Sequence, residues 1–324
     1  MALNQKAIKS RITSVKNTKK ITKAMEMVSA AKMRRAIDAA LNTRTYATLA
    51  RELMEHLSLV DGVEAPLLQR RSVKNLLVVL ISSNRGLCGS FNSNLAKALK
   101  EKLIDLEHFA AHNIRKEGDE IVLPEKNVTV SILGVGKRSA AFAKREGYEL
   151  VGVYDSISEK PQLEDILPVA KQVIEGFVSG TFDKVAVAYT DFYSSIQQVP
   201  HIRTLLPVSG KSLEKIERTM AKTDYADKEF SVKPSSVDIE TYLFEPNTET
   251  ILNEVLPRLV EVQLYQALLE SAASEHSARM IAMKNASEAA GDMINQLTLE
   301  SNKARQAAIT QEIAEIAGGA AALA

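Results

Sequence analysis

The residues best placed to do chemistry lie in one turn, Asn84-Arg85-Gly86-Leu87-Cys88-Gly89. The turn follows a continuous apolar run, LLVVLISS, and precedes a helical stretch from Phe91 to about Leu106. Such strand–turn–helix junctions bind phosphate in many α/β proteins, because backbone N–H groups at the helix start point at the anion. The turn fits neither of the standard glycine-rich nucleotide patterns, and Gly134-Val135-Gly136 fits them no better. We interpret it as a structural turn, with nucleotide binding as the alternative.

Cysteine and histidine offer few further candidates. Cys88 is the only cysteine, so no intrachain disulfide can form and a reducing compartment is expected. A nucleophilic thiol needs a histidine beside it, and the sequence places none there, so we predict a packed thiol. His108 and His112 have helical i, i+4 spacing, but two ligands do not complete a zinc site. We therefore predict no catalytic, cofactor-binding or metal site.

The middle of the chain, residues 73–245, alternates apolar strand patterns with helical ones. This alternation predicts an open, Rossmann-like α/β domain. Two polar stretches, at about 108–127 and 209–238, are expected to be surface insertions. Besides the apolar run before Asn84, the expected strands are 128–133, 184–189, 198–206 and 239–244, and the expected helices after Phe91–Leu106 are 137–145 and 163–178.

Residues 1–60 are predicted to form one long helix, because positions 3–57 contain neither glycine nor proline. Apolar residues recur at heptad-like spacing, with a slip of the heptad after Val15. The two expected seam triplets are Ile8, Ile12, Val15 and Ile21, Met25, Val28.

The same N-terminal segment is strongly basic. Its first 58 residues carry 12 Lys/Arg against 4 Asp/Glu, a net charge of +8, whereas the whole chain has +1. This asymmetry indicates an acidic partner, with a solvated helix face as the alternative. Interleaved aromatic residues and nucleic-acid motifs are missing, so we do not expect a nucleic-acid partner. The chain has no run of 18 apolar residues that would span a membrane.

The last part of the chain, residues 247–324, predicts a second long helix. The roughly 65 residues after Pro257 would extend about 100 Å, so this helix must pair with another, most simply as an antiparallel coiled coil with residues 1–60. Pro257 is expected to bend the helix near Val255–Pro257, and the last nine residues carry no charged side chain. Half of the expected seam is Ser or Ala, which favours a slender shaft: Met280, Met283, Ser287, Ala290, Ile294, Leu297, Ser301 and Ala304.

Five stretches of the sequence closely resemble the gamma-subunit family of F-type ATP synthases, of the bacterial type. They occur in the expected order and include both chain ends and the central domain. They are KNTKKITKAMEMVSAAKMRRA (16–36), SNRGLCGSFN (83–92), QVPHIRTLLP (198–207), and SEHSARMIAMKNASEAA with NKARQAAITQEIAEI (274–290, 302–316).

The resemblance implies a non-catalytic rotor shaft that couples rotation of the membrane c-ring to conformational cycling of the beta-subunit catalytic sites. The implied partners are the ring of alpha and beta subunits, the epsilon subunit and the c-ring. The chain would then be peripheral to the bacterial inner membrane, on its cytoplasmic face. The positions that match family contacts with the alpha/beta ring are Lys23, Met25, Lys32, Arg279, Gln306 and Thr310.

The sequence differs from some members of this family in one respect, and two other classes of function are kept as alternatives. Chloroplast members carry a two-cysteine insertion near residues 209–238, but this chain has no cysteine there, which excludes a thiol switch. The first alternative is a nucleotide-binding α/β enzyme with a coiled-coil oligomerisation stalk. The second is a static adaptor whose basic helix binds an acidic protein or nucleic acid.

Overall fold

The computed structural model describes residues 2–57, 65–111, 127–157, 160–208 and 248–323. These residues form two compact units, one of residues 31–278 and one of residues 1–30 together with 279–324. The two longest helices, α1 (Ala2–Leu57) and α7 (Thr248–Leu323), contribute to both units.

The larger unit is built on a five-stranded sheet ordered β3-β2-β1-β4-β5. β1 pairs in parallel with β2 and β4, β2 pairs in parallel with β3, and only β5 is antiparallel to its neighbour. This arrangement confirms the predicted open α/β sheet. The strands are β1 (Asn75–Ile81), β2 (Thr129–Val135), β3 (Glu149–Tyr154), β4 (Lys184–Phe192) and β5 (Gln198–Leu206).

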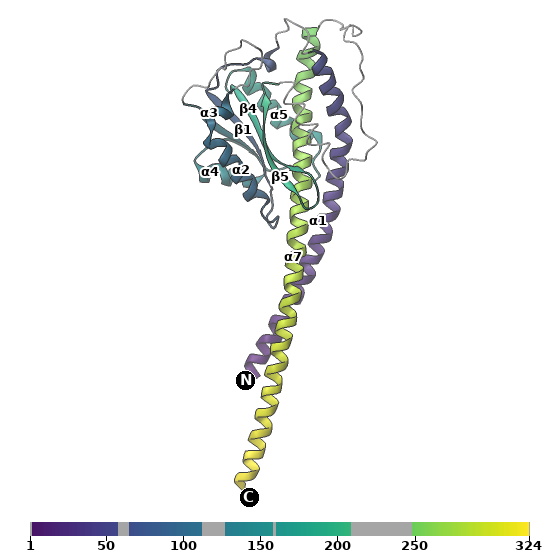
Figure 1. The fold of residues 1–324 in the computed structure, drawn as a ribbon, viewed down its shortest axis with the longest axis vertical. Coiled ribbons are helices and arrows are strands. Elements are labelled where there is room, and N and C mark those ends of the chain that lie inside the picture. The colour runs from purple at the N-terminus through teal and green to yellow at the C-terminus, as the bar shows by residue number, and fades with distance from the viewer. Residues whose placement is uncertain (1, 58–64, 112–126, 158–159, 209–247, 324) are drawn as a thin grey trace. The chain divides into compact units, whose positions relative to one another are not determined.

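Helices cover both faces of this sheet (Figure 1). β1 shows why its sequence is continuously apolar: Leu77 and Val79 face one core cluster, whereas Leu76 and Val78 face the other. The first cluster is closed by α5 (Leu163–Val178) and by Leu252–Leu268 of α7. The second is closed by α2 (Phe91–Ile104), α3 (Leu106–Ala110) and α4 (Lys137–Glu146). A short 3-10 helix, η1 (Pro66–Leu68), adds Leu67 to the first cluster.

Two features of this unit differ from the sequence expectations. β3 was missed, because it is an edge strand with Gly152 inside it and side chains that stay exposed or half-buried. The polar insertion expected at 108–127 begins instead as helix α3, and residues 112–126 lie outside the described residues. The expected strand 239–244 and the insertion 209–238 also lie outside them.

The smaller unit consists of two helices that run in opposite directions, so the N terminus lies beside α7 and the C-terminal part of α7 extends past it (Figure 1). The burial pattern confirms the predicted seam of α7. Met283, Ser287, Ala290, Leu297 and Ser301 are buried, and the three other expected positions are half-buried. Small residues in this seam let the helix axes approach closely.

The seam of α1 differs from the prediction after Val15. Ile21 and Val28 are 61% and 52% exposed, whereas Thr22 and Ser29 are buried. The step from Val15 to Thr22 is seven residues, so the heptad continues without the expected slip. The apolar pattern was misleading because the buried positions hold small polar residues. The Thr22 hydroxyl, for example, donates to the Lys19 carbonyl at 3.1 Å.

α7 runs without interruption through Pro257. Proline in a helix interior removes one backbone hydrogen bond and crowds the preceding turn. The helix continues because it is anchored on both sides of the proline by Leu256 and Leu259, which are buried in the core beneath the sheet. Pro257 therefore does not end a separate short helix.

Candidate functional site

The turn after β1 ties together the carboxyl ends of three strands. The Asn84 amide donates to the Asp155 carbonyl after β3 at 3.0 Å, and its oxygen accepts from the Lys137 N–H at the start of α4 at 3.0 Å. The next N–H of α4, from Arg138, is donated to the Ser83 carbonyl. The first N–H groups of α4, after Gly136, are therefore already used and are not offered to a phosphate, and Asn84 itself holds the strand ends together as a structural turn would.

The nearby glycines serve close packing. Gly136 has a φ of +89°, and a side chain there would collide with the Ser82 carbonyl. A side chain at Gly134 would collide with the hydroxyl of Ser139. Glycine is needed at position 134 because α4 packs closely on β2, and at position 136 because the chain there lies against Ser82. These packing requirements explain the G-x-G spacing without a bound nucleotide.

Cys88 is a packed thiol, as expected. It is buried, and its Sγ accepts a hydrogen bond from the Asn92 amide at 3.3 Å. Of the two candidate metal-binding histidines, His108 pairs with Asp105 at 2.9 Å, and His112 lies outside the described residues. Within the described parts of the chain, no group of three or more His, Cys, Asp or Glu side chains could hold a metal ion.

Sequence reasoning missed a group of buried ionisable residues between β4 and α7. Asp191 and Glu270 are both buried, and the Asp191 carboxylate lies 3.3 Å from Nε2 of His201. The guanidinium of Arg203 lies 4.6 Å from the ring centroid of Tyr189. Burial, assisted by the charge of Asp191, raises the pKa of Glu270 to about 8. The available signal was a glutamate inside the apolar stretch QALLESAA.

Lys184 is a second buried charge that sequence reasoning missed. It is the first residue of β4, is only 4% exposed, and donates to the carbonyls of Phe109 and Ala111 at 2.8 and 3.1 Å. Burial lowers its pKa to about 8. The lysine thus binds carbonyl groups at the end of α3 that the helix itself cannot satisfy.

The structure distributes the predicted partner-contact residues over both units. Lys23, Met25, Arg279, Gln306 and Thr310 belong to the two-helix unit, whereas Lys32 belongs to the larger unit. These six do not form one cluster.

Their local environments differ. The ammonium of Lys23 is exposed and pairs with Glu26 at 2.9 Å. Met25 is half-buried on the seam, and Arg279 is only 9% exposed. Gln306 and Thr310 are exposed one turn apart on α7, and the Thr310 hydroxyl donates to the Gln306 carbonyl at 3.0 Å.

Exposed apolar side chains mark both helices of the smaller unit. On α7, Ile309, Ile313 and Ile316 recur at 4,3 spacing and are 45%, 62% and 73% exposed. On α1, Ile21 and Met27 are similarly exposed. Repeated large apolar residues on one helix face are unusual at a free surface and typical of a partner-binding face.

None of the helices that the structure describes is both long enough and apolar enough to cross a membrane.

This chain is similar to known proteins over almost its whole length. The family model described as ATP synthase matches residues 4–323. The ATP synthase gamma chain of Chloroflexus aurantiacus is 40% identical over 324 residues, covering 99% of each chain. That of Heliobacterium modesticaldum is 40% identical over 317 residues, covering 98% of each.

A solved structure supports the fold. A chain of the rotor of the Euglena gracilis mitochondrial ATP synthase superposes with a TM-score of 0.57 at 20% identity, covering 95% of this chain and 100% of that one. With the long paired helices and the mixed sheet, the whole-length matches lead to one conclusion: the chain belongs to the ATP synthase gamma-chain family.

Proposed function

We propose that this chain is the central rotor shaft of a proton-translocating ATP synthase and that it has no active site of its own. The observation that carries the proposal is the end of α7. From Arg305 to Ala320 every residue except Ala308 is exposed, and three isoleucines lie along that stretch. A helix of this length with an apolar, unpacked end requires a surrounding surface supplied by other chains.

In this proposal the surrounding surface is the ring of alpha and beta subunits. The c-ring turns with proton flow, and this chain, together with the epsilon subunit, turns with it. Because the shaft presents different side chains at each angle, it contacts each beta subunit differently. Such differential contacts change the populations of the conformations of a catalytic site. The chemistry of ATP synthesis then belongs entirely to the beta subunits.

The basic first helix is assigned to electrostatic contact with the ring. The cationic groups of Lys23 and Lys32, with Met25 between them, would meet acidic loops of the beta subunits. Arg279, Gln306 and Thr310 would contact the ring from α7. Charge supports this assignment, because the first 58 residues have a net charge of +8.

We also place the complex on the cytoplasmic face of a bacterial inner membrane. The chain itself would be attached to the membrane only through the c-ring. The 40% identity to gamma chains of bacteria supports this location. The single cysteine is buried and forms no disulfide, which fits a reducing compartment.

The experiment is co-purification of an affinity-tagged chain from membranes, followed by an assay of ATP hydrolysis. We expect the alpha and beta subunits to accompany the chain in high salt and the eluted complex to hydrolyse ATP. The purified chain alone should show no hydrolysis. Recovery of the chain without larger subunits, or hydrolysis by the chain alone, would contradict the proposal.

A further inference from the structure

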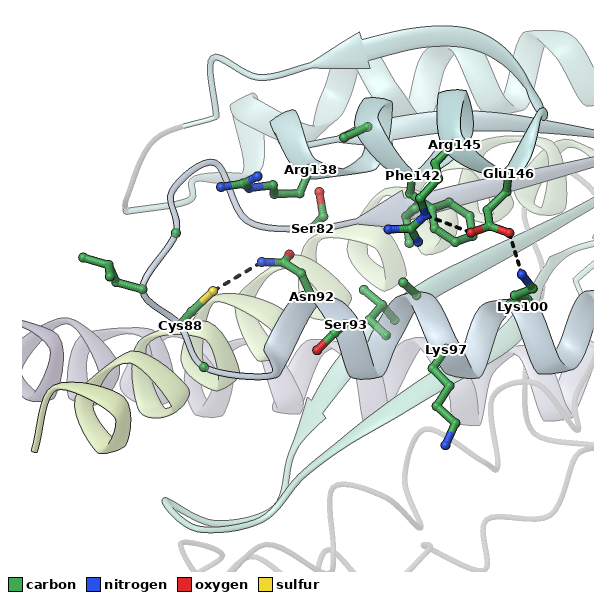
Figure 2. Close-up of a pocket in the computed structure, with 17 residues that line it drawn as sticks. Ser82, Cys88, Asn92, Ser93, Lys97, Lys100, Arg138, Phe142, Arg145 and Glu146 are labelled. Atoms are coloured by element: carbon green, nitrogen blue, oxygen red, sulfur yellow. Dashed lines mark hydrogen bonds and ion pairs between the residues drawn. The ribbon is translucent and has the colours of Figure 1, made fainter. Parts of the chain in front are cut away.

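A pocket of about 650 Å³ lies on the sheet face covered by α2 and α4 (Figure 2). It belongs entirely to the larger unit, and its size is within the range of small-molecule sites.

The pocket has an apolar floor. Leu80 of β1, Leu95 of α2 and Phe142 of α4 line it and are themselves 5% exposed or less. Ala96 of α2 and Ala141 of α4 also line it, and their small side chains leave the space between the helices unfilled. Apolar walls with a few polar groups are typical of sites for small molecules.

The polar groups around this floor are mostly cationic. The lining includes Lys97, Lys100, Arg138 and Arg145 against a single acidic residue, Glu146. Glu146 binds Lys100 and Arg145, each at 2.9 Å, so two of the cations share one carboxylate. Lys97 extends from α2 away from α4 (Figure 2).

Arg138 is the cation best placed to bind a ligand. It lies at the opposite end of the pocket from the Glu146 group, beside the turn after β1 (Figure 2). Among the described residues no acidic side chain pairs with its guanidinium, which lies against Gly86 of the turn. An arginine in this position can donate two parallel hydrogen bonds to a phosphate group.

The same turn displays an unusual residue at the mouth of the pocket. Leu87 has a φ of +62° and is 61% exposed. A leucine rarely adopts this left-handed conformation, which costs on the order of 1–2 kcal/mol. The turn therefore holds a large apolar side chain exposed to solvent at the lining of the pocket.

We propose that this pocket binds a phosphate ester with an apolar or aromatic body, the phosphate on Arg138 and the body over the floor formed by Leu95 and Phe142. The ligand would be either a soluble ester such as a nucleotide or the headgroup of an anionic phospholipid. The proposal goes beyond the rotor function and does not depend on it.

The test uses the full-length chain and takes advantage of its lack of tryptophan. Ser93→Trp, at the pocket lining, introduces a single indole whose fluorescence reports occupancy. Lys171→Trp, at an exposed position of α5 on the other face of the sheet, is the matched control. We expect ATP or pyrophosphate at millimolar concentration or below to change the emission of Ser93→Trp and not that of Lys171→Trp.

Two further variants distinguish the contribution of the Arg138 charge to binding from that of the open volume of the pocket. In the Ser93→Trp background, Arg138→Ala should weaken binding about tenfold or more, because it removes a charge-assisted contact. Ala141→Phe should abolish binding by filling the pocket while every charge is kept. Lys171→Ala should have no effect. Unchanged circular dichroism would show that each variant is folded.

A second experiment, with lipid vesicles, distinguishes a soluble phosphate ester from a phospholipid headgroup as the ligand. The same proteins are mixed with vesicles of phosphatidylglycerol or of phosphatidylcholine and followed by flotation. Binding to phosphatidylglycerol alone, lost in Arg138→Ala, would assign the site to a lipid headgroup. The proposal is wrong if ATP, pyrophosphate and phosphatidylglycerol all fail to bind, or if binding is unchanged in Arg138→Ala and Ala141→Phe.

Discussion

The ammonium group of Lys184, at the first residue of β4, donates a hydrogen bond of 2.8 Å to the main-chain carbonyl of Phe109 at the end of α3. The same ammonium lies 5.7 Å from the centroid of the Phe109 ring. A short helix of five residues thus has its last carbonyls bound by a buried charge from the sheet. This contact attaches α3, a short helix that does not itself connect two strands, to β4 of the central sheet.

The buried ammonium of Lys184 should make the stability of the folded chain depend on pH. Burial lowers the pKa of Lys184 from 10.5 to about 8, so between these values the unfolded chain binds more protons than the folded one. The free energy of unfolding therefore rises with pH through this window, by about 3 kcal/mol. In Lys184→Met the rise should be absent.

Urea unfolding of the wild type and Lys184→Met at pH 7.5 and pH 10 measures this effect. The difference between the two proteins should shift in favour of the wild type at pH 10. Lys171→Met, which removes an exposed lysine on α5, should follow the wild type. A difference that is the same at both pH values would show that the buried lysine does not titrate in this range.

Glu270 should give a pH dependence of the opposite sign. Burial raises its pKa from 4.5 to about 8, so the folded chain binds the extra proton between these values. Its contribution to stability is present below pH 4.5 and is lost as the pH rises through 8, by about 1.4 kcal/mol for each pH unit. Glu270→Gln keeps the shape and the neutral state, and should be more stable than the wild type at pH 8.

Thermal or urea unfolding at pH 5 and pH 8 tests this prediction. Glu175→Gln, at an exposed position of α5, is the control and should show no pH-dependent difference from the wild type. A stability difference between Glu270→Gln and the wild type that is the same at both pH values would show that Glu270 does not titrate between them and would contradict the prediction.

The sequence allowed the regular elements to be predicted because their patterns are local. β1 is a continuous apolar run, and α5 was expected at its observed bounds, 163–178. The seam of α7 was likewise readable from 3 and 4 spacings. β3 was not, because an exposed edge strand has no apolar alternation to detect.

The buried groups that the prediction missed depend on tertiary contacts. Whether Lys184 lies in solvent or against the Phe109 carbonyl is decided by residues 75 positions away. Thr22 was missed on the seam of α1 because a small polar residue carries no hydrophobic signal, although its hydroxyl is satisfied by the Lys19 carbonyl. The six partner-contact residues were expected from the family resemblance alone and stay a prediction. The pocket between α2 and α4 became visible only in the structure.

Two helix glycines should respond oppositely to alanine. At Gly291 in α7, a methyl group would meet only the end of the Lys19 side chain, Nζ at 2.9 Å and Cε at 3.7 Å, which can move aside. Gly291→Ala should therefore stabilise the two-helix unit by up to about 1 kcal/mol through helix propensity. At Gly176 in α5, the methyl would press on the buried ring of Phe182 at 2.7 Å, so Gly176→Ala should destabilise the larger unit by about 1–3 kcal/mol.

Chemical unfolding of both variants checks the signs. Gly318→Ala, at a position where a methyl meets nothing within 4 Å, isolates helix propensity from packing. A loss of stability in Gly291→Ala would mean that Lys19 cannot be displaced.

Met25→Lys should lower coupling between proton flow and ATP turnover more than it lowers assembly. Met25 is half-buried between the seam residues Thr22 and Ser29. A lysine can extend its charge to the surface from such a position, so it would change the face that the proposed function assigns to contact with the beta subunits. Proton pumping per ATP hydrolysed, measured in inverted membrane vesicles, should fall while the amount of bound complex is retained.

Exposed Ile21→Lys is the companion variant, since Ile21 lies outside the seam and its replacement leaves the helix pairing unchanged. It should also reduce coupling. Parallel loss of assembly and coupling in Met25→Lys would indicate a folding defect. Arg279→Ala should reduce ATP turnover without loss of the folded subunit, because contacts along a shaft are distributed.

The central claim is that this chain rotates, and a single-molecule measurement tests it most directly. Cys88 is buried, so a cysteine introduced at exposed Lys171 can carry a bead on the assembled, surface-fixed complex. We predict stepwise rotation of the bead in one direction during ATP hydrolysis, stopping when ATP is removed. Continued ATP hydrolysis with a stationary bead would contradict the account.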